Sequence, residues 1–273
     1  MEKIAIYGKG GIGKSFIATS LSVSYAMSGR KVLHVGCDPK HDSAIRLIDG
    51  QVEVRTVLDV LGDDPTANAT AQILNRGRHG IDACEAGGPE AGLGCGGRGV
   101  ARMIEYLDET RLLETGGYDV AIFDVLGDVV CGGFAAPLRE GFARKVLIVV
   151  TDQPMALFAA NNISRAVLAY QRNHVVLAGL VLNQVDTGTD RGIIDRFAAR
   201  IGTRTLASLQ HDTRIMDGER QQRTIVEHAP DSVPARAIAE LGNTVMAIRP
   251  DDVPLPTPMT DQEFFAFLRE GNG

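Results

Sequence analysis

The chain has 273 residues and a net charge of −6, because 34 acidic residues outnumber 28 basic ones. That balance argues against nucleic acid as the main partner, since binding to phosphates needs a surplus of Lys and Arg. Hydrophobic residues make up 44% of the chain, but no uninterrupted apolar run approaches the roughly 20 residues of a membrane-spanning helix.

The N-terminal residues MEKIAIYGKGG enter a strand-like segment almost at once. A secretory signal would instead show a charged region, a long apolar run and a cleavage site with small residues. We therefore expect a cytoplasmic protein with no membrane partner.

Apolar, β-branched segments predict strands, and the amphipathic segments between them predict helices. Near-continuous hydrophobic strands are typical of a sheet covered on both faces, so this alternation predicts an α/β fold with a mainly parallel, doubly wound sheet. The expected strands are Lys3–Tyr7, Lys31–Val35, Tyr118–Asp124, Lys145–Thr151 and Val175–Asn183. The expected helices include Ser15–Ser28, Gly99–Leu113 and Met155–Tyr170.

The composition changes near the C-terminus, where the Pro-rich stretch Pro250–Pro258 precedes a short amphipathic segment, Asp261–Glu270. We find no repeat and no low-complexity linker elsewhere, so residues 1–273 are expected to form a single domain with a tail and helix from about residue 250. The apolar residues of the last helix are expected to pack on the core: Phe264, Phe265, Phe267 and Leu268.

The segment Gly8–Ser15 reads GKGGIGKS and fits the P-loop pattern G-x-x-x-x-G-K-[ST], between the first strand and the first helix. Its glycines let backbone N–H groups surround phosphate oxygens, and the helix N-terminus favours negative charge. Lys14 is expected to reach the β- and γ-phosphates, and the Ser15 hydroxyl to bind Mg²⁺. The residues expected around the nucleotide phosphates are Gly10, Gly11, Ile12, Gly13, Lys14, Ser15 and Phe16.

Lys9 places a second lysine inside the same loop. This feature is typical of P-loop ATPases of the deviant Walker A class, in which that lysine reaches across a dimer to the partner's nucleotide. We therefore expect a homodimer in which Lys9 takes part in ATP hydrolysis.

Acidic residues follow two of the expected strands. Asp38 and Asp42 follow the second strand, while Asp124 ends the third and Asp128 comes four positions later. A lone Asp at such a place is more often a helix cap or a turn residue. Here the carboxyl ends of parallel strands lie beside a P-loop, and phosphoryl transfer needs carboxylates for Mg²⁺ and for the attacking water. Asp124 is the expected Walker-B-type carboxylate.

Two of the four cysteines, Cys95 and Cys131, lie among glycines. Glycine-rich loops make poor cores, and they let backbone N–H groups approach an inorganic cluster. The other two, Cys37 and Cys84, adjoin apolar strand-like runs, so we expect them to be small buried residues. Because Cys131 follows Asp124 by only seven positions, a shift at the Mg²⁺ site would pull on a potential cluster ligand.

Four segments of the chain resemble the iron protein of nitrogenase and its relatives: YGKGGIGKS, GCDPKHDS, EAGGPEAGLGCGGRGV and DVLGDVVCGGFAAPL. The relatives include the reductase subunits of protochlorophyllide, chlorophyllide and methylthio-alkane reduction, and of nickel-sirohydrochlorin reductive cyclisation. The resemblance continues through Phe158–Ile163, Asn183 and Pro258–Thr260, and so covers essentially the whole chain.

The resemblance implies an ATP-dependent reductase that donates single electrons to a heteromeric catalytic component, with ferredoxin or flavodoxin as its own donor. Cys95 and Cys131 from each of two subunits would hold one [4Fe-4S] cluster, and Arg98 would dock the catalytic partner. Asn183 would contact adenine, with Asp212 and Glu219 near the base and ribose. The implied Mg²⁺ ligands are Ser15, Asp42 and Asp124. The implied catalytic residues are Lys9, Asp38 and Asp128.

The chain also departs from individual members of that family. Phe16 replaces a common threonine, and Gln210 and His211 stand where the nitrogenase protein more often has a proline and an arginine. Arg98 is kept, whereas CDPKHDS and GGFAAPL look more like the protochlorophyllide type. This mosaic favours an enzyme outside nitrogen fixation, with methylthio-alkane reduction first and protochlorophyllide reduction second.

Other classes of protein use the same fold. Positioning ATPases of division sites commonly end in a basic amphipathic helix that binds membrane, but the polar face of Asp261–Glu270 is acidic. Partition ATPases bind DNA, which the net charge disfavours. Chaperones that carry iron–sulfur clusters usually have a C-x-x-C pair, and this sequence has none.

Overall fold

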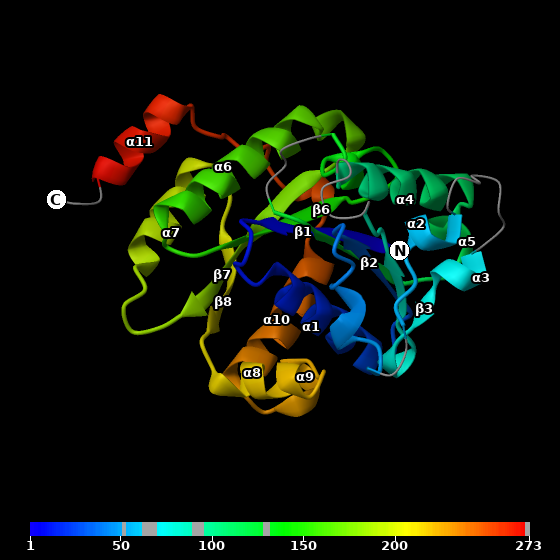
Figure 1. Ribbon diagram of the computed structural model, residues 1–273. Coiled ribbons are helices and arrows are strands. Elements are labelled where there is room, and N and C mark those ends of the chain that lie inside the picture. The colour runs from blue at the N-terminus through cyan, green and yellow to red at the C-terminus, as the bar shows by residue number, and fades with distance from the viewer. Residues whose placement is uncertain (51–52, 62–69, 89–95, 128–131, 271–273) are drawn as a thin grey trace.

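The computed structural model describes residues 1–50, 53–61, 70–88, 96–127 and 132–270. Its centre is an eight-stranded sheet with the strand order β3-β4-β2-β5-β1-β6-β7-β8 (Figure 1). The short strand β3 runs antiparallel to β4, and the other neighbouring strands are parallel. The strands are β1 (Glu2–Gly8), β2 (Val32–Cys37), β3 (Asn75–Arg76), β4 (Asp82–Glu85), β5 (Val120–Val125), β6 (Lys145–Val150), β7 (Val176–Val185) and β8 (Thr205–Gln210).

The α/β fold with a mainly parallel sheet is therefore confirmed, and each of the five expected strands is present. Three further strands, β3, β4 and β8, were not expected from the sequence. β4 reads DACE and β8 reads TLASLQ, so neither has the continuous β-branched run that a central parallel strand shows. These strands lie toward the two edges of the sheet, where burial on both faces is not required.

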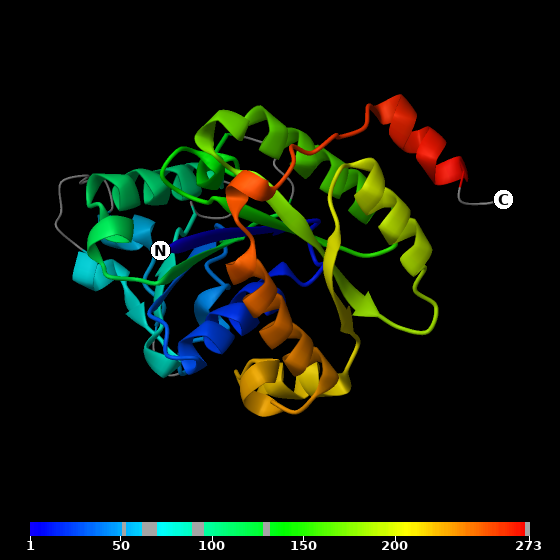
Figure 2. The ribbon, with the colours of Figure 1, turned by 180° about the vertical axis from the view of Figure 1, so that it is seen from behind.

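Helices cover both faces of the sheet (Figures 1 and 2). Strand β1 contributes to both layers, because Ala5 and Tyr7 belong to one hydrophobic cluster and Ile4 and Ile6 to the other. The first cluster lies under α4, α6 and α7, and the second lies against α1 and α10. The helices are α1 (Lys14–Met27), α2 (Val57–Leu61), α3 (Thr70–Ile73), α4 (Gly97–Glu109), α5 (Leu112–Thr115), α6 (Pro154–Ala169), α7 (Arg191–Arg200), α8 (Thr213–Arg220), α9 (Ile225–His228), α10 (Val233–Ala247) and α11 (Asp261–Glu270).

The last helix, α11, packs through an aromatic cluster that joins it to α6 and α7. Phe264 is 1% exposed and lies edge-on to Phe158, with ring centroids 5.3 Å apart, while Phe267 packs beside Phe197. The expectation that Phe265 is buried is wrong, since its side chain is 49% exposed and only stacks over Phe158. The helical period places residue 265 on the outer side of the helix, next to the polar face.

This difference predicts unequal effects of two adjacent substitutions. Phe264→Ala removes a fully buried ring and should lower the free energy of unfolding by about 3–5 kcal/mol. Phe265→Ala removes mainly one stacking contact and should cost about 1 kcal/mol. Denaturant unfolding of the two variants measures the difference, and equal losses would contradict the packing of α11 described above.

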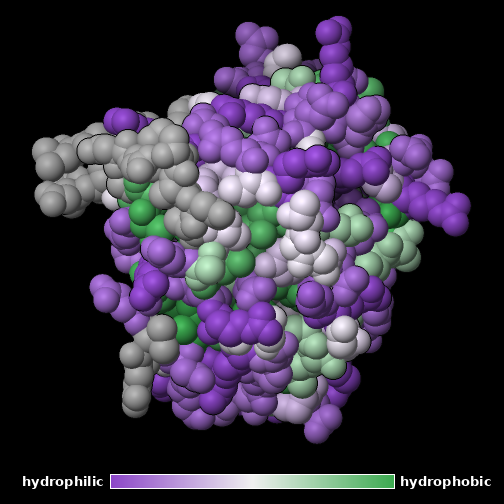
Figure 3. Space-filling model, turned by 90° about the vertical axis from the view of Figure 1, so that its right-hand side faces the viewer, coloured by the Kyte–Doolittle hydropathy of each residue, from purple (hydrophilic) through white to green (hydrophobic). Residues whose placement is uncertain are grey.

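None of the helices in the described part of the chain is both long enough and apolar enough to cross a bilayer. The face on the right of Figure 1, shown in Figure 3, is mainly hydrophilic in its described part, with hydrophobic residues in small groups. Small exposed apolar groups of this kind are ordinary on protein surfaces.

Candidate functional site

The P-loop connects β1 to α1 at the carboxyl edge of the sheet. Gly11 and Gly13 have φ values of 76° and 98°, a left-handed conformation that glycine adopts without strain. A Cβ on Gly13 would also overlap the amide nitrogen of Asn183. That amide donates a 2.8 Å hydrogen bond to the carbonyl of Ile12. A residue of β7 therefore holds the backbone of the P-loop.

The two loop lysines differ in environment. The Lys14 side chain is buried, and its ammonium donates a 3.0 Å hydrogen bond to the backbone carbonyl of Lys9. Lys9 itself is half-buried, and Gly10 is exposed. Ile12 turns its side chain into the core, so only its backbone can contribute to a phosphate site.

A cavity of about 410 Å³ opens beside this loop. It brings together residues that lie more than 200 positions apart in the sequence, from the P-loop, Arg46, the end of β7, and α8 with its N-cap. The residues expected at the nucleotide that line this cavity are Gly11, Gly13, Lys14, Ser15, Phe16, Asn183, Asp212 and Glu219.

The cavity also contains residues that the sequence reading did not select. Arg46 forms an ion pair with Glu219, at 3.0 Å, across the cavity wall. Met216 is 53% exposed although it is hydrophobic, which suits contact with a flat apolar base. Their positions follow no motif, so only the fold could reveal them. The lining residues that the sequence did not indicate are Arg46, Gln184, Ile215 and Met216, while Gln210 and His211 line the cavity at the positions already compared with the nitrogenase protein.

Asp124 is the buried carboxylate of the site. It is 4% exposed and receives the hydroxyl hydrogen bond of Ser43. Burial raises the pKa of Asp124, and hydrogen bonds from Ser15 and Ser43, together with the nearby Lys14 charge, oppose that rise. The arrangement thus holds a carboxylate next to the hydroxyl that the P-loop pattern assigns to Mg²⁺.

Asp42 is exposed and lies with Ser15 on a second cavity of about 360 Å³ that shares Arg46 and Glu219 with the first. Within the described residues, no group of three or more His, Cys, Asp or Glu side chains is placed to hold a metal ion alone. Mg²⁺ commonly binds through one or two carboxylates together with waters and nucleotide phosphates. The donors here fit Mg²⁺ bound with a nucleotide.

Two of the other expected carboxylates also have local structural roles. Asp38 accepts a 2.8 Å hydrogen bond from the backbone N–H of Lys40, and burial raises the pKa of Asp38. Asp212 caps α8, where its carboxylate accepts from the backbone N–H of Arg214. The guanidinium of Arg214 lies 2.6 Å away and holds the pKa of Asp212 below its usual range.

Three expected site residues, Cys95, Asp128 and Cys131, lie outside the described residues. The chain is described again from Gly96 and from Gly132 onward, and these two stretches, the cysteine segments, meet. A Cβ on Gly133, two residues after Cys131, would overlap the backbone of Gly97, two residues after Cys95. This approach between two backbones fits a shared cluster, since its ligands need loops that lie side by side.

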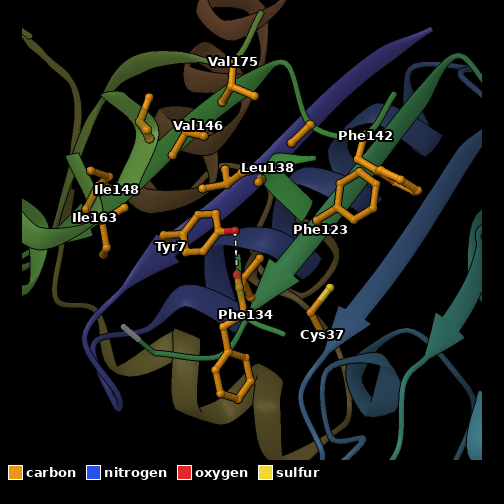
Figure 4. Close-up of a cluster of buried hydrophobic side chains, with 14 of the residues drawn as sticks. Tyr7, Cys37, Phe123, Phe134, Leu138, Phe142, Val146, Ile148, Ile163 and Val175 are labelled. Carbon is orange, nitrogen blue, oxygen red and sulfur yellow. Dashed lines mark hydrogen bonds between the residues drawn. The ribbon is translucent and has the colours of Figure 1, made fainter. Parts of the chain in front are cut away.

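Both cysteine segments also contact the nucleotide side of the molecule. The hydroxyl of Tyr7, at the end of β1, donates a 3.0 Å hydrogen bond to the carbonyl of Phe134 (Figure 4). Pro39, next to Asp38, packs so closely that a Cβ on either Gly88 or Gly96 would overlap its ring. Those two glycines border the segment that contains Cys95.

Arg98 lies in the first turn of α4 and is exposed, as a residue that contacts a partner protein must be. Cys37 and Cys84 are fully buried and have free thiols. The expectation that these two cysteines serve as small core residues is confirmed.

Over residues 2–272, the chain matches the family described as "4Fe-4S iron sulfur cluster binding proteins, NifH/frxC family". The chain belongs to this family. It is 40% identical to a nitrogenase iron protein of Methanococcus voltae over 96% of its own length and 94% of that protein. It is 39% identical to nitrogenase iron protein 2 of Methanothermobacter thermautotrophicus over 99% of the chain and 98% of that protein.

Solved structures with lower identity share the fold of this NifH/frxC-family chain. The cell division protein MinD of Aquifex aeolicus superimposes with a TM-score of 0.69 at 17% identity, over 93% of this chain and 99% of that one. The septum site-determining protein MinD of Pyrococcus horikoshii, with Mg-ADP, gives 0.71 at 20% identity, over 90% and 97%. These likenesses establish the fold of the deviant Walker A ATPases and no more.

Family membership makes this protein an ATP-hydrolysing reductase component that binds MgATP and a [4Fe-4S] cluster between subunits. It also implies a homodimer that works with a catalytic component. The positioning ATPase alternative is thereby set aside, because it shares the fold but not the sequence family.

Proposed function

We propose that this protein is the electron-donating component of a nitrogenase-like two-component enzyme outside nitrogen fixation, with methylthio-alkane reduction as its system. The chain would act as one domain, in the cytoplasm, with ferredoxin or flavodoxin as its electron donor. The observation that carries the proposal is the packing of both cysteine segments against elements that also form the nucleotide site.

In this proposal, lysines of the site bind the nucleotide phosphates, and oxygen ligands of the site bind Mg²⁺. Lys14 neutralises phosphate charge from within the loop, and Lys9 reaches the nucleotide of the partner subunit. Ser15, Asp42 and Asp124 hold Mg²⁺ with the phosphates, which is the arrangement Mg²⁺ commonly takes. The carboxylates proposed to orient the attacking water and its proton are Asp38 and Asp128.

The base would lie in the inner part of the 410 Å³ cavity. Asn183 would contact the adenine, since it lines the cavity and its amide already donates a hydrogen bond to the Ile12 carbonyl of the loop. Glu219 on α8 and Asp212, the N-cap residue of that helix, also line the cavity and would lie near the ribose. The ion pair between Arg46 and Glu219 must adjust when a nucleotide enters, since both side chains line the cavity.

Two connections would couple hydrolysis to electron transfer. Asp124 lies on the strand that leads to Cys131, and Tyr7 ties the end of that segment to β1, directly before the P-loop. Pro39 links the segment of Asp38 to the glycines around Cys95. A [4Fe-4S] cluster held by Cys95 and Cys131 would supply the single electron. Movement of Asp38 or Asp124 would change the position of both ligand segments and of Arg98, as in other nucleotide switches.

The choice of system is supported by the departures from the nitrogenase pattern. Phe16, Gln210 and His211, which the sequence analysis named as departures from the nitrogenase pattern, all line the nucleotide cavity. Arg98 is exposed on α4 and available to a partner.

The test combines the reduced, cluster-containing protein with purified catalytic components of the methylthio-alkane, protochlorophyllide and nitrogenase systems. Product formation should require MgATP and occur with the methylthio-alkane component. The control replaces ATP with a non-hydrolysable analogue, which should stop product formation. Turnover confined to the protochlorophyllide or nitrogenase component would overturn the proposed system, and turnover without ATP would overturn the proposed coupling.

A further inference from the structure

A line of buried hydrogen bonds runs behind the P-loop and ends on Asp124. His34, in the middle of β2, is fully buried. Its Nδ1 lies 2.9 Å from the hydroxyl of Ser22 on α1, and its Nε2 lies 2.8 Å from the hydroxyl of Ser43. The Ser43 hydroxyl contacts the carboxylate of Asp124 on β5. The line therefore joins the helix after the P-loop to the strand that leads to Cys131.

The direction of each hydrogen bond follows from counting hydrogens. Ser43 has one hydroxyl hydrogen and gives it to the carboxylate of Asp124, so its oxygen must accept from Nε2–H of His34. Burial lowers the pKa of His34 to about 3, so the ring is neutral and has one N–H. Its Nδ1 must then accept the hydroxyl hydrogen of Ser22. Every donor in the line points toward Asp124.

We infer that His34 is a positioning residue for the Mg²⁺ site, acting through Ser43 to fix the orientation of the Asp124 carboxylate. The inference rests on the proposed function, in which Asp124 serves Mg²⁺. Without the N–H of His34, the oxygen of Ser43 loses its donor, and the hydroxyl is free to rotate away from Asp124. Ser43 also follows Asp42 directly in the chain, so a shift of Ser43 would move the backbone that carries a second carboxylate of the proposed site.

Packing alone does not explain a histidine at this position. The flanking residues Leu33 and Val35 are apolar and fully buried, as expected for a central parallel strand. A buried polar group costs free energy unless its hydrogen bonds are made. The bonds of His34 are made only because Ser22 and Ser43 face it from two other segments. Outer partners of this kind commonly change metal affinity by about 10–100-fold when removed.

The test uses substitutions that separate the two sides of the ring. Glutamine can place an amide N–H near the position of Nε2, so His34→Gln keeps a donor for Ser43. Asparagine can place an amide oxygen near Nδ1, so His34→Asn keeps only the acceptor for Ser22. His34→Leu removes both. Each cluster-containing dimer is titrated with Mg²⁺ while binding of a fluorescent ADP is followed, and binding is measured again in EDTA.

The Mg²⁺ half-saturation should rise about tenfold in His34→Asn and His34→Leu, and His34→Gln should stay close to the wild-type protein. ADP affinity in EDTA and the melting temperature separate this effect from damage to the fold. A wild-type Mg²⁺ titration for His34→Leu would overturn the inference, as would equal losses with and without Mg²⁺. Equal behaviour of the Gln and Leu variants would also overturn it, because the donor to Ser43 would then not matter.

Asp124→Asn in the same titration tests the proposed function separately. A wild-type Mg²⁺ half-saturation for this variant would remove Asp124 from the Mg²⁺ site, whatever the His34 variants show. Ser22→Ala is a matched control, since it changes only the far end of the line and should leave the Mg²⁺ half-saturation within about twofold.

Discussion

Gly133→Ala should yield a protein that loses most of its iron. An added Cβ at this position would overlap the backbone of Gly97, and neither backbone can move aside as a flexible side chain could. The two cysteine segments would be forced apart, at a cost of about 1–3 kcal/mol typical of overpacking. We expect iron per dimer to fall to roughly a third or less of the wild-type value.

The neighbouring residue provides the control. Among the residues that the structure describes, a Cβ on Gly132 would meet no atom within 4 Å, so Gly132→Ala should keep its iron and its melting temperature. Iron content of the two anaerobically purified variants gives the comparison. Equal iron in both would contradict the close packing of Gly97 and Gly133 as a requirement for the cluster.

The second large effect concerns Lys14. Its replacement by Gln keeps a polar side chain of similar length but removes the positive charge beside the phosphates. Removal of one charge-stabilising group from a phosphoryl-transfer site should lower ATP hydrolysis by about 10²–10³-fold. The rate of phosphate release by the cluster-containing dimer, with its catalytic component present, measures this loss.

Lys31→Gln removes the same charge from an exposed position. Lys31 directly precedes β2, at the amino ends of the parallel strands, whereas the P-loop lies at their carboxyl ends. This control should keep the wild-type rate. Hydrolysis by the Lys14 variant within threefold of the wild-type rate, which is roughly 0.7 kcal/mol of barrier, would contradict the assigned role of Lys14.

The sequence predicted those parts of the molecule in which local pattern and three-dimensional position coincide. The P-loop is one example, because a strand, a glycine-rich turn and a helix follow each other within a few residues. The buried strands β1, β2, β5, β6 and β7 are another, since continuous apolar runs reflect burial on both faces. Asp124 could be predicted from the two together, because it is the carboxylate at the end of a buried strand and the P-loop lies at the same end of the sheet.

Other features depend on contacts between distant segments, and no local pattern indicates them. Arg46 reaches the nucleotide cavity because η1 (Ala44–Arg46) lies opposite α8, more than 160 positions later, where Glu219 pairs with it. The hydrogen bonds of His34 could not be predicted from its strand alone, because its partners Ser22 and Ser43 come from other segments. Phe265 is a different case, because the helical period of α11 indicates its outer position and only the apolar composition of the segment suggested burial.

We propose that two subunits share one [4Fe-4S] cluster through Cys95 and Cys131. Iron and acid-labile sulfide per dimer, measured on anaerobically purified protein with EPR of the reduced sample, test it most directly. We predict about four irons and four sulfides per dimer with a reduced [4Fe-4S] signal, and loss of both in Cys95→Ser and Cys131→Ser. About eight irons per dimer, or a cluster that survives both substitutions, would contradict the claim.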